Sequence, residues 1–354
     1  MKALVITNKN KPLEVQEVAR PVAGAGEAIV RVHAAALNHR DVWIQKGMYA
    51  GLKYPIVPGS DGAGVVVEVG GRSGNEPDQE RLEDGGDWQG FGWIGKEVII
   101  NPSLDWGASE AWQDPAGFHI LGLPDDGTFA EYVKVPVANL VEKPTNLSFE
   151  EAAALPLAGV TAYRALMTRA RVQPGEKVLI TGIGGGVALF ALQFAVAAGA
   201  EVIVTSGSPD KLDKAMALGA TGCANYGESG WVDTLKSLAG AFDVIIDGAA
   251  GDGMNDLLDL AMPGGRVVIY GATRGNPTQV VARRIFWKQL QVLGSTMGSP
   301  ADFRSMIDFV GRHSIRPVVD TVFPFEDGEA AMRWMDDARQ FGKIVIRVRS
   351  EAIP

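Results

Sequence analysis

Cysteine and histidine are scarce in this sequence, and their scarcity narrows the possible chemistry. The 354 residues include one cysteine, Cys223, and four histidines. A single cysteine excludes an intrachain disulfide and a cysteine-rich metal cage. It also suits a reducing compartment, where disulfides do not persist. We therefore predict a cytoplasmic location.

Long apolar runs and an excess of positive charge are also missing. The longest apolar stretch, residues 187–200, contains Gln193 and is too short to span a bilayer. The N-terminus lacks the apolar core of a signal peptide. The formal net charge is −9, which disfavours nucleic acid or an anionic membrane as a partner. We predict a protein with neither kind of partner.

The pattern along the chain predicts two domains of an α/β protein. The chain is too long for one ordinary core. Its first 150 residues form short β-runs separated by glycine and proline. From about Leu155, buried β-branched strands alternate with helices, which is typical of a doubly wound parallel sheet. We interpret the acidic, glycine-rich segment 71–92 as a long surface loop.

A glycine-rich turn follows the first strand of the alternating region. The predicted strand 177–181 leads into Gly-Ile-Gly-Gly-Gly-Val at 182–187 and then into an apolar helix. Such glycines let the backbone approach a pyrophosphate, and the helix N-terminus offers free N–H groups. The literal GxGxxG pattern fails at Val187, but the strand and helix around the turn favour a dinucleotide site over a structural turn. The cofactor-binding residues predicted in this turn are Gly182, Gly185, Gly186 and Val187.

The end of the next strand indicates NADP(H) as the cofactor. An NAD site usually places Asp or Glu at this tip, where it binds the ribose 2′-hydroxyl. Here the strand 201–205 continues as Ser-Gly-Ser-Pro-Asp-Lys, with no carboxylate at the tip. Asp210 lies further along and is interpreted as a first-turn helix residue. We predict that Ser206 and Lys211 hold a 2′-phosphate; a solvated helix charge at Lys211 is the alternative.

Several ordered motifs extend this interpretation to nearly the whole chain. They are Leu-Asn-His-Arg-Asp at 37–41, the glycine-rich 57–66, Gly-Thr-Phe-Ala-Glu-Tyr at 127–132, Gly-Val-Thr-Ala-Tyr at 159–163 and the glycine turn. In this order they resemble the medium-chain dehydrogenases/reductases. The resemblance implies a GroES-like, β-rich catalytic domain over residues 1–153 and 298–354. It also implies a Rossmann dinucleotide-binding domain over residues 154–297.

The sequence departs from the family's zinc enzymes at the metal ligands. The zinc alcohol dehydrogenases place Cys, His and Cys or Asp at positions that here carry Asn38, Ser60 and Leu157. None of these side chains is a thiolate, an imidazole or a carboxylate, the donors that zinc uses. The four cysteines of the structural zinc lobe are also absent from 101–118. We therefore predict no metal.

The same region resembles the zinc-free quinone oxidoreductase and enoyl reductase branch. Members of that branch carry Asn followed eleven residues later by Tyr, as Asn38 and Tyr49 are here. The predicted catalytic residues are Tyr49, as a donor to a carbonyl oxygen, and Asn38, which orients substrate or nicotinamide. The alternative for Tyr49 is a pocket-wall aromatic without a role in proton donation. For Arg40, a structural ion pair with Asp41 is the alternative to contact with the substrate. The resemblance further assigns Thr161, Tyr226, Gly271 and Lys343 to the cofactor site.

Together these features predict a zinc-independent, NADP(H)-dependent oxidoreductase that reduces quinones or α,β-unsaturated carbonyl compounds. Such acceptors delocalise the incoming electrons without a Lewis acid. A non-catalytic NADP(H)-binding protein of regulatory or structural type, and an alcohol dehydrogenase with atypical zinc ligands, are the alternatives. The resemblance implies a homodimer or homotetramer, joined through the edge strand at 292–294.

Overall fold

A computed structural model describes residues 1–71 and 91–349. The chain forms two compact units. The first unit comprises Met1–Pro156, Val319–Arg339 and Ile344–Pro354, and the second comprises Leu157–Val318 and Gln340–Lys343. The surface loop predicted over 71–92 falls almost wholly outside the described residues.

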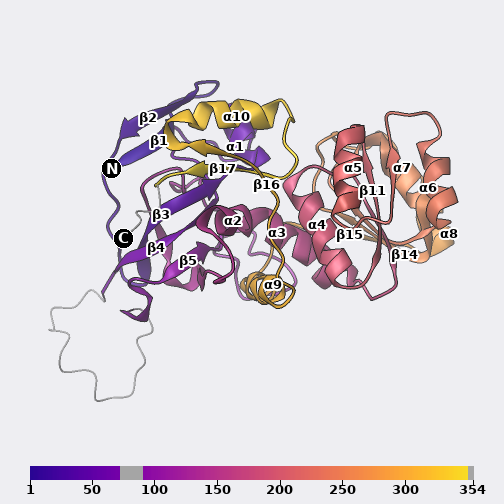
Figure 1. The fold of residues 1–354 in the computed structure, drawn as a ribbon, viewed down its shortest axis with the longest axis horizontal. Coiled ribbons are helices and arrows are strands. Elements are labelled where there is room, and N and C mark those ends of the chain that lie inside the picture. Colours follow the sequence, from indigo (N-terminus) through magenta and orange to yellow (C-terminus); the bar gives the residue numbers. More distant parts are fainter. Residues whose placement is uncertain (72–90, 350–354) are drawn as a thin grey trace, which may run out of the picture. The chain divides into compact units, whose positions relative to one another are not determined.

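The first unit is built on an antiparallel sheet of order β16-β17-β3-β4-β5-β9, with β8 also paired to β3 (Figure 1). The strands are β3 (Glu27–Ala36), β4 (Asp61–Val69), β5 (Glu97–Ile100), β8 (Tyr132–Pro136), β9 (Leu140–Glu142), β16 (Val319–Pro324) and β17 (Lys343–Arg347). Smaller pairs join β1 (Lys2–Ile6) to β2 (Leu13–Glu17) and β6 (Ser103–Leu104) to β7 (His119–Ile120). Val30, Val66 and Phe129 lie in the buried core of this unit.

Short helices complete the first unit. They are α1 (His39–Gln45), α2 (Phe149–Ala154), α10 (Gly328–Asp336) and the 3-10 turns Phe91–Trp93, Val137–Asn139 and Phe325–Asp327. Helix α2 begins where Ser148 Oγ accepts the backbone N–H of Glu151, a usual N-terminal cap. α1 directly follows β3, so residues 38–41 stand at the end of a buried central strand.

The second unit is a parallel sheet of order β12-β11-β10-β13-β14-β15 with helices between the strands. The strands are β10 (Lys177–Ile180), β11 (Glu201–Ser206), β12 (Gly222–Asn225), β13 (Phe242–Asp247), β14 (Ala261–Ile269) and β15 (Gln291–Gly294). The chain winds outward in one direction from β10 and in the other from β13. The boundary between these two strands is therefore the topological switch point, where such sheets bind ligands at their carboxyl ends.

The helices of the second unit follow from the apolar pattern of the sequence. They are α3 (Pro156–Tyr163), a π-helix (Arg164–Ala170), α4 (Gly186–Ala197), α5 (Pro209–Ala217), α6 (Trp231–Ala239), the 3-10 turn Gly251–Gly253, α7 (Met254–Leu260), α8 (Ala282–Lys288) and α9 (Pro300–Arg312). α4 is apolar nearly all round, and Phe190, Leu192 and Phe194 on it are fully buried. The predicted α/β class, with one β-rich and one doubly wound unit, is confirmed.

The structure places residues 298–318 in the second unit, although the sequence assigns them to the catalytic domain. A buried ion pair explains this placement. Asp302 Oδ2, in the first turn of α9, binds Arg164 Nη1 of the π-helix, and Asp302 Oδ1 accepts the hydroxyl of Thr168 at 2.5 Å. Ser299 Oγ caps α9 by accepting the backbone N–H of Asp302 at 3.1 Å, and Asp302 Oδ2 accepts the backbone N–H of Ser299 at 2.9 Å in return. Within the described residues, no helix has the length and apolar character needed to cross a membrane.

Candidate active site

A buried carboxylate joins the two strands at the switch point. Asp247, the last residue of β13, is 2 % exposed. Its Oδ1 accepts the hydroxyl of Thr181, next to the end of β10, at 2.5 Å, and its Oδ2 accepts the backbone N–H of Ala250 at 2.7 Å. Sequence reasoning missed this residue, because the contact joins strands that are far apart in the chain. Asp247 fixes the strand ends from which the candidate dinucleotide site is built.

The glycine turn has the backbone that a dinucleotide site requires. Gly182 and Gly184 have φ values of +66° and +122°, a region that favours glycine. A Cβ on Gly182 or Gly185 would meet no protein atom within 4 Å, so the space above both residues is open. α4 begins at Gly186, and Gly185 before it supplies no capping side chain. The first-turn N–H groups of α4, including that of Val187, suit an anionic ligand.

Two lysine side chains pack against this turn. A Cβ on Gly184 would lie 2.7 Å from Lys211 Cδ, and one on Gly186 would lie 2.8 Å from Lys343 Cδ. Gly342 N donates to Gly184 O at 3.0 Å, which holds the returning chain on the turn. The φ of +122° at Gly184 disfavours any side chain there, and a Cβ at 184 or 186 would displace the lysine stems. Lys211 and Lys343 therefore flank the glycine turn with two positive charges. These two lysines and the turn were predicted separately from the sequence, and the structure brings them together.

The tip of β11 forms the second part of the candidate cofactor site. Ser206 is 4 % exposed, and its Oγ accepts the backbone N–H of Ser208 at 3.2 Å. The ring of Tyr226 lies against Gly207, where a Cβ would be 2.9 Å from the ring. The carboxylate of Asp210 pairs with Lys214 at 2.8 Å along α5. The structure thus brings Ser206 and Tyr226 to one turn, while the Asp210 carboxylate is engaged on its own helix.

The remaining cofactor candidates lie elsewhere in the second unit. Thr161 is buried on α3, and its hydroxyl donates to Leu157 O at 2.7 Å. Gly271 follows β14, and a Cβ there would lie 2.9 Å from Gly248 O. Glycine at 271 is thus required by the close approach of the loop after β13. The roles predicted for Thr161 and Gly271 toward the cofactor stay predictions.

In the first unit, Asn38 lies in a buried polar cluster. Its Nδ2 donates to Asp61 Oδ2 at 2.9 Å, and its backbone N–H donates to Asp41 Oδ2 at 2.8 Å. Asp41 and Asp61 are fully buried. The two carboxylates therefore fix both the amide orientation of Asn38 and the start of α1.

Arg40 connects this cluster to Tyr49. Its Nη1 donates to Ser60 Oγ at 2.6 Å and to Leu121 O at 2.8 Å. Its Nε lies 3.4 Å from Tyr49 Oη, and its Cζ lies 5.0 Å from the centroid of the Tyr49 ring. The side chain is only 5 % exposed. The ion pair with Asp41 considered from the sequence is not the arrangement found, because Arg40 binds these oxygens and Asp41 caps α1.

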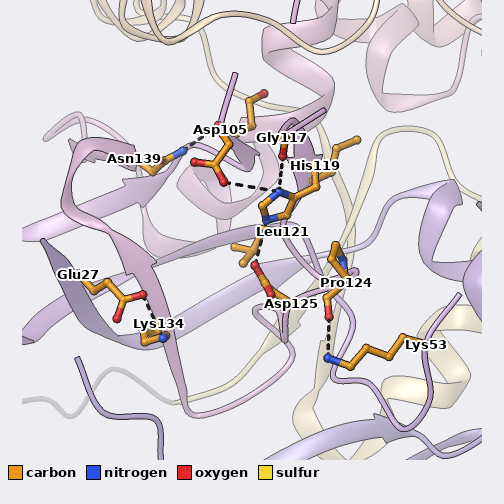
Figure 2. A network of polar contacts seen from close by, with 12 residues as sticks. Glu27, Lys53, Asp105, Gly117, His119, Leu121, Pro124, Asp125, Lys134 and Asn139 are labelled. Carbon is orange, nitrogen blue, oxygen red and sulfur yellow. Dashed lines mark hydrogen bonds and ion pairs between the residues drawn. The ribbon is translucent and has the colours of Figure 1, made fainter. Parts of the chain in front are cut away.

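A histidine network fixes the loop whose carbonyls bind Arg40 (Figure 2). His119 Nε2 lies 2.9 Å from Asp125 Oδ2, and Nδ1 lies 3.0 Å from Gly117 O and 3.8 Å from Asp105 Oδ2. Burial lowers the pKa of His119, but the hydrogen bond to Gly117 and the two carboxylates outweigh it, and the net pKa is raised. Sequence reasoning gave His119 no role, since its partners are set by the folding of this loop.

The donors at the family's zinc-ligand positions do not suit a metal ion. Ser60 Oγ accepts from the Arg40 guanidinium, and the Asn38 amide donates to Asp61. A neighbouring fixed cation opposes the binding of a second cation. Across residues 1–71 and 91–349, no group of three or more His, Cys, Asp or Glu is arranged to hold a metal.

Comparisons with known proteins match both units. The Alcohol dehydrogenase GroES-like domain matches residues 24–145, and the Zinc-binding dehydrogenase family matches residues 186–312. A "Zinc-type alcohol dehydrogenase-like protein YogA" of Leptosphaeria maculans is 36 % identical over 353 residues, covering 95 % of each chain. An acryloyl-coenzyme A reductase of Metallosphaera sedula is 29 % identical, covering 98 % of this chain and 99 % of the relative. A crystal structure of an NAD-dependent alcohol dehydrogenase is 38 % identical with a TM-score of 0.87, covering 99 % and 100 %.

The fold and the glycine turn define a nucleotide-binding dehydrogenase. The chain belongs to the medium-chain dehydrogenase/reductase family and is an oxidoreductase, so the predicted family and the GroES-like and Rossmann domains are confirmed. The relatives' names include a zinc-type protein and an acyl-CoA reductase. Membership of the zinc-free branch and the use of NADP(H) therefore stay predictions.

Proposed function

We propose that this protein is a zinc-independent, NADP(H)-dependent oxidoreductase that reduces quinones or α,β-unsaturated carbonyl compounds. The observation that carries the proposal is the 2.6 Å hydrogen bond from Arg40 to Ser60. It puts a buried cation against a position where the family's zinc enzymes need a metal ligand. The protein therefore activates its substrate with its own donors.

The second unit holds the cofactor. The open turn at Gly182 and Gly185, with the N-terminus of α4, suits the pyrophosphate, and Lys343 adds a cation beside it. Ser206 and Lys211 bind the 2′-phosphate. The carboxylate of Asp210 is paired with Lys214, which supports NADP(H) over NAD(H) because a ribose 2′-hydroxyl would need a carboxylate at the tip of β11. When bound, NADPH supplies the hydride.

Tyr49 donates a hydrogen bond to the substrate carbonyl. A guanidinium has donors only, so the hydroxyl oxygen of Tyr49 is the acceptor in its contact with Arg40. The O–H of Tyr49 is then left to donate to an oxygen of the substrate. That oxygen becomes anionic as hydride arrives, and an aligned donor there stabilises the transition state by about 3 kcal/mol.

Asn38 is the residue that orients the reactants. The acceptor itself must delocalise the charge that hydride transfer creates. Asp61 fixes the amide of Asn38, so this side chain presents one face to substrate or nicotinamide. With hydrogen bonds in place of a Lewis acid, an acceptor that delocalises charge is favoured. A quinone or an enone does so, since hydride at one carbon places the charge on a remote oxygen.

NADPH oxidation by the purified protein tests the proposal. We expect turnover with 1,4-naphthoquinone or with a simple enone, unchanged after chelator treatment and with substoichiometric zinc by mass spectrometry. Stoichiometric zinc together with chelator-sensitive alcohol oxidation would identify an alcohol dehydrogenase with atypical ligands. Tight NADPH binding without turnover of any acceptor would identify a non-catalytic binding protein.

We also propose that copies of the chain pair through the edge of the parallel sheet. β15 is the last strand in the sheet order, and Val292 on it is 36 % exposed. Phe286 and Trp287 on the neighbouring α8 are 65 % and 74 % exposed. An open strand edge beside large apolar side chains favours strand addition by a second copy. A homodimer or homotetramer in the cytoplasm is the proposed state.

A further inference from the structure

We propose that Arg274 is a second cation of the 2′-phosphate site and that it increases the preference for NADPH over NADH. The inference rests on the proposed NADP(H) site. Arg274 lies in the loop after β14, four strand positions from β12 in the sheet order. Nothing in the sequence pattern pointed to it, because the loop is remote from the glycine turn in the chain.

The loop after β14 extends over the carboxyl edge of the sheet. Strands lie about 4.8 Å apart, so β14 and β12 are separated by roughly 19 Å, more than an arginine side chain spans. Arg274 N donates to Ala249 O at 2.9 Å, and Thr273 N donates to Gly248 O at 3.2 Å. Gly251 N donates to Gly275 O at 2.9 Å. These bonds hold the loop on the turn after β13, toward the switch point.

The side chain of Arg274 then reaches the residue that follows β12. Its guanidinium Cζ lies 5.0 Å from the centroid of the Tyr226 ring. The hydroxyl-bearing edge of that ring faces Gly207, where a Cβ would lie 2.9 Å from Cε2 and 3.4 Å from Oη. Gly207 stands between Ser206 and Ser208, at the start of α5. The stacked pair therefore lies beside the turn assigned to the 2′-phosphate.

The charges around this turn leave the guanidinium available to an anion. Within the described parts of the chain, Arg274 is exposed and has no ion pair. The nearby carboxylates have other partners: Asp210 pairs with Lys214, Glu228 accepts from Asn225 Nδ2 at 3.0 Å, and Asp252 accepts from Thr278 at 2.7 Å. A planar guanidinium binds phosphate oxygens through two parallel N–H groups. Stacking on Tyr226 pre-orients it for that contact.

The test compares cofactors that differ only in the 2′-phosphate. We would measure dissociation constants of NADPH and NADH by cofactor fluorescence, and of 2′,5′-ADP and 5′-AMP by calorimetry, for wild type and Arg274→Gln. We expect NADPH and 2′,5′-ADP to bind roughly ten- to hundredfold more weakly, as for a lost charge-assisted hydrogen bond. NADH and 5′-AMP should change by no more than about twofold. Arg274→Lys should restore part of the affinity.

A matched control is Arg283→Gln, which removes an arginine stacked on Trp287 at 5.7 Å. It should leave all four dissociation constants unchanged. Equal losses for NADPH and NADH in Arg274→Gln, or no loss for either, would overturn the assignment of Arg274 while leaving the NADP(H) site in place. A wild-type protein that binds NADH as tightly as NADPH would instead overturn the proposed cofactor itself.

Discussion

Arg40 places a buried positive charge beside Ser60, at a position where the family's zinc enzymes carry a metal ligand. Its guanidinium is buried, yet its partners are the neutral oxygens of Ser60, Ile120, Leu121 and Tyr49. The neighbouring carboxylates Asp41 and Asp61 bind Asn38 instead. Across residues 1–71 and 91–349, the positive charge is therefore held next to Tyr49 with no carboxylate among its hydrogen-bond partners.

Replacing Tyr49 tests its role as the donor. We expect Tyr49→Phe to lower kcat on the order of 100-fold with a quinone or enone substrate, because the developing oxyanion loses its hydrogen bond. The dissociation constant of NADPH should stay the same. Steady-state kinetics and fluorescence titration measure the two effects. Tyr132→Phe, in a ring stacked under Arg20, is the control. An unchanged kcat in Tyr49→Phe would make Tyr49 a wall of the pocket.

Lys211 gives a second prediction at the level of one side chain. Lys211→Met keeps the stem that covers Gly184 but removes the ammonium. We expect NADPH to bind about tenfold more weakly and NADH nearly as before, since only NADPH carries the 2′-phosphate. Titration of both cofactors measures this. Lys236→Met, on α6 and paired with Asp233, should change neither affinity. Equal losses for both cofactors would contradict the assignment.

At the scale of elements, the link between α9 and the π-helix predicts a large effect on stability. Arg164 is 3 % exposed and Asp302 is 7 % exposed. Asp302→Ala removes the carboxylate that pairs with a buried cation and the side-chain half of the α9 capping box, so we expect a loss of about 3–5 kcal/mol. Chemical denaturation measures the free energy of unfolding. Asp308→Ala, at an exposed site on α9, should cost less than about 0.5 kcal/mol. Similar losses in both variants would argue against the buried pair.

The loop that contains His119 predicts a pH dependence. The pKa of His119 is raised above the ordinary value of 6.5. The contribution of His119 to the free energy of unfolding is therefore fully present below about pH 6.5. It is lost as the pH rises through the folded-state pKa of His119. We expect the stability difference between wild type and His119→Gln to shrink as the pH rises through that range. Denaturation at a series of pH values measures it, and a constant difference would contradict the network in Figure 2.

Elements with a periodic pattern could be predicted from the sequence, whereas contacts between distant segments could not. The parallel strands and the helix after the glycine turn follow from β-branched runs and apolar periodicity. The partners of Arg40 lie at Ser60 and Leu121, and Asp247 reaches back to Thr181. Such contacts depend on how strands are ordered in space. The structure groups residues 298–318 with the second unit, which the sequence could not indicate because an amphipathic helix does not reveal which core it covers.

At the scale of the whole molecule, the edge of the parallel sheet predicts assembly. Val292→Asp puts a charge on the exposed side of β15 and should shift a dimer or tetramer toward a smaller species. Light scattering coupled to gel filtration measures the mass. Leu238→Asp, at another exposed apolar position on α6, is the control and should leave the mass unchanged. A wild-type monomer, or a Val292→Asp variant of unchanged mass, would contradict pairing through this edge.

The hydrogen bond from Gly342 to Gly184 has a consequence for how the protein is made. The parallel sheet consists of strands that end at Gly294, but the glycine turn is covered only when Gly342 and Lys343 return to it. During translation, the sheet can therefore form before Gly342 binds Gly184 O and before Lys343 lies beside the turn. Residues still inside the ribosome cannot fold onto the turn, so the proposed cofactor site is complete only after residue 343 has been made and has left the ribosome. Under the proposed cofactor assignment, full-strength binding of the nucleotide is thereby a late event in the synthesis and folding of the protein.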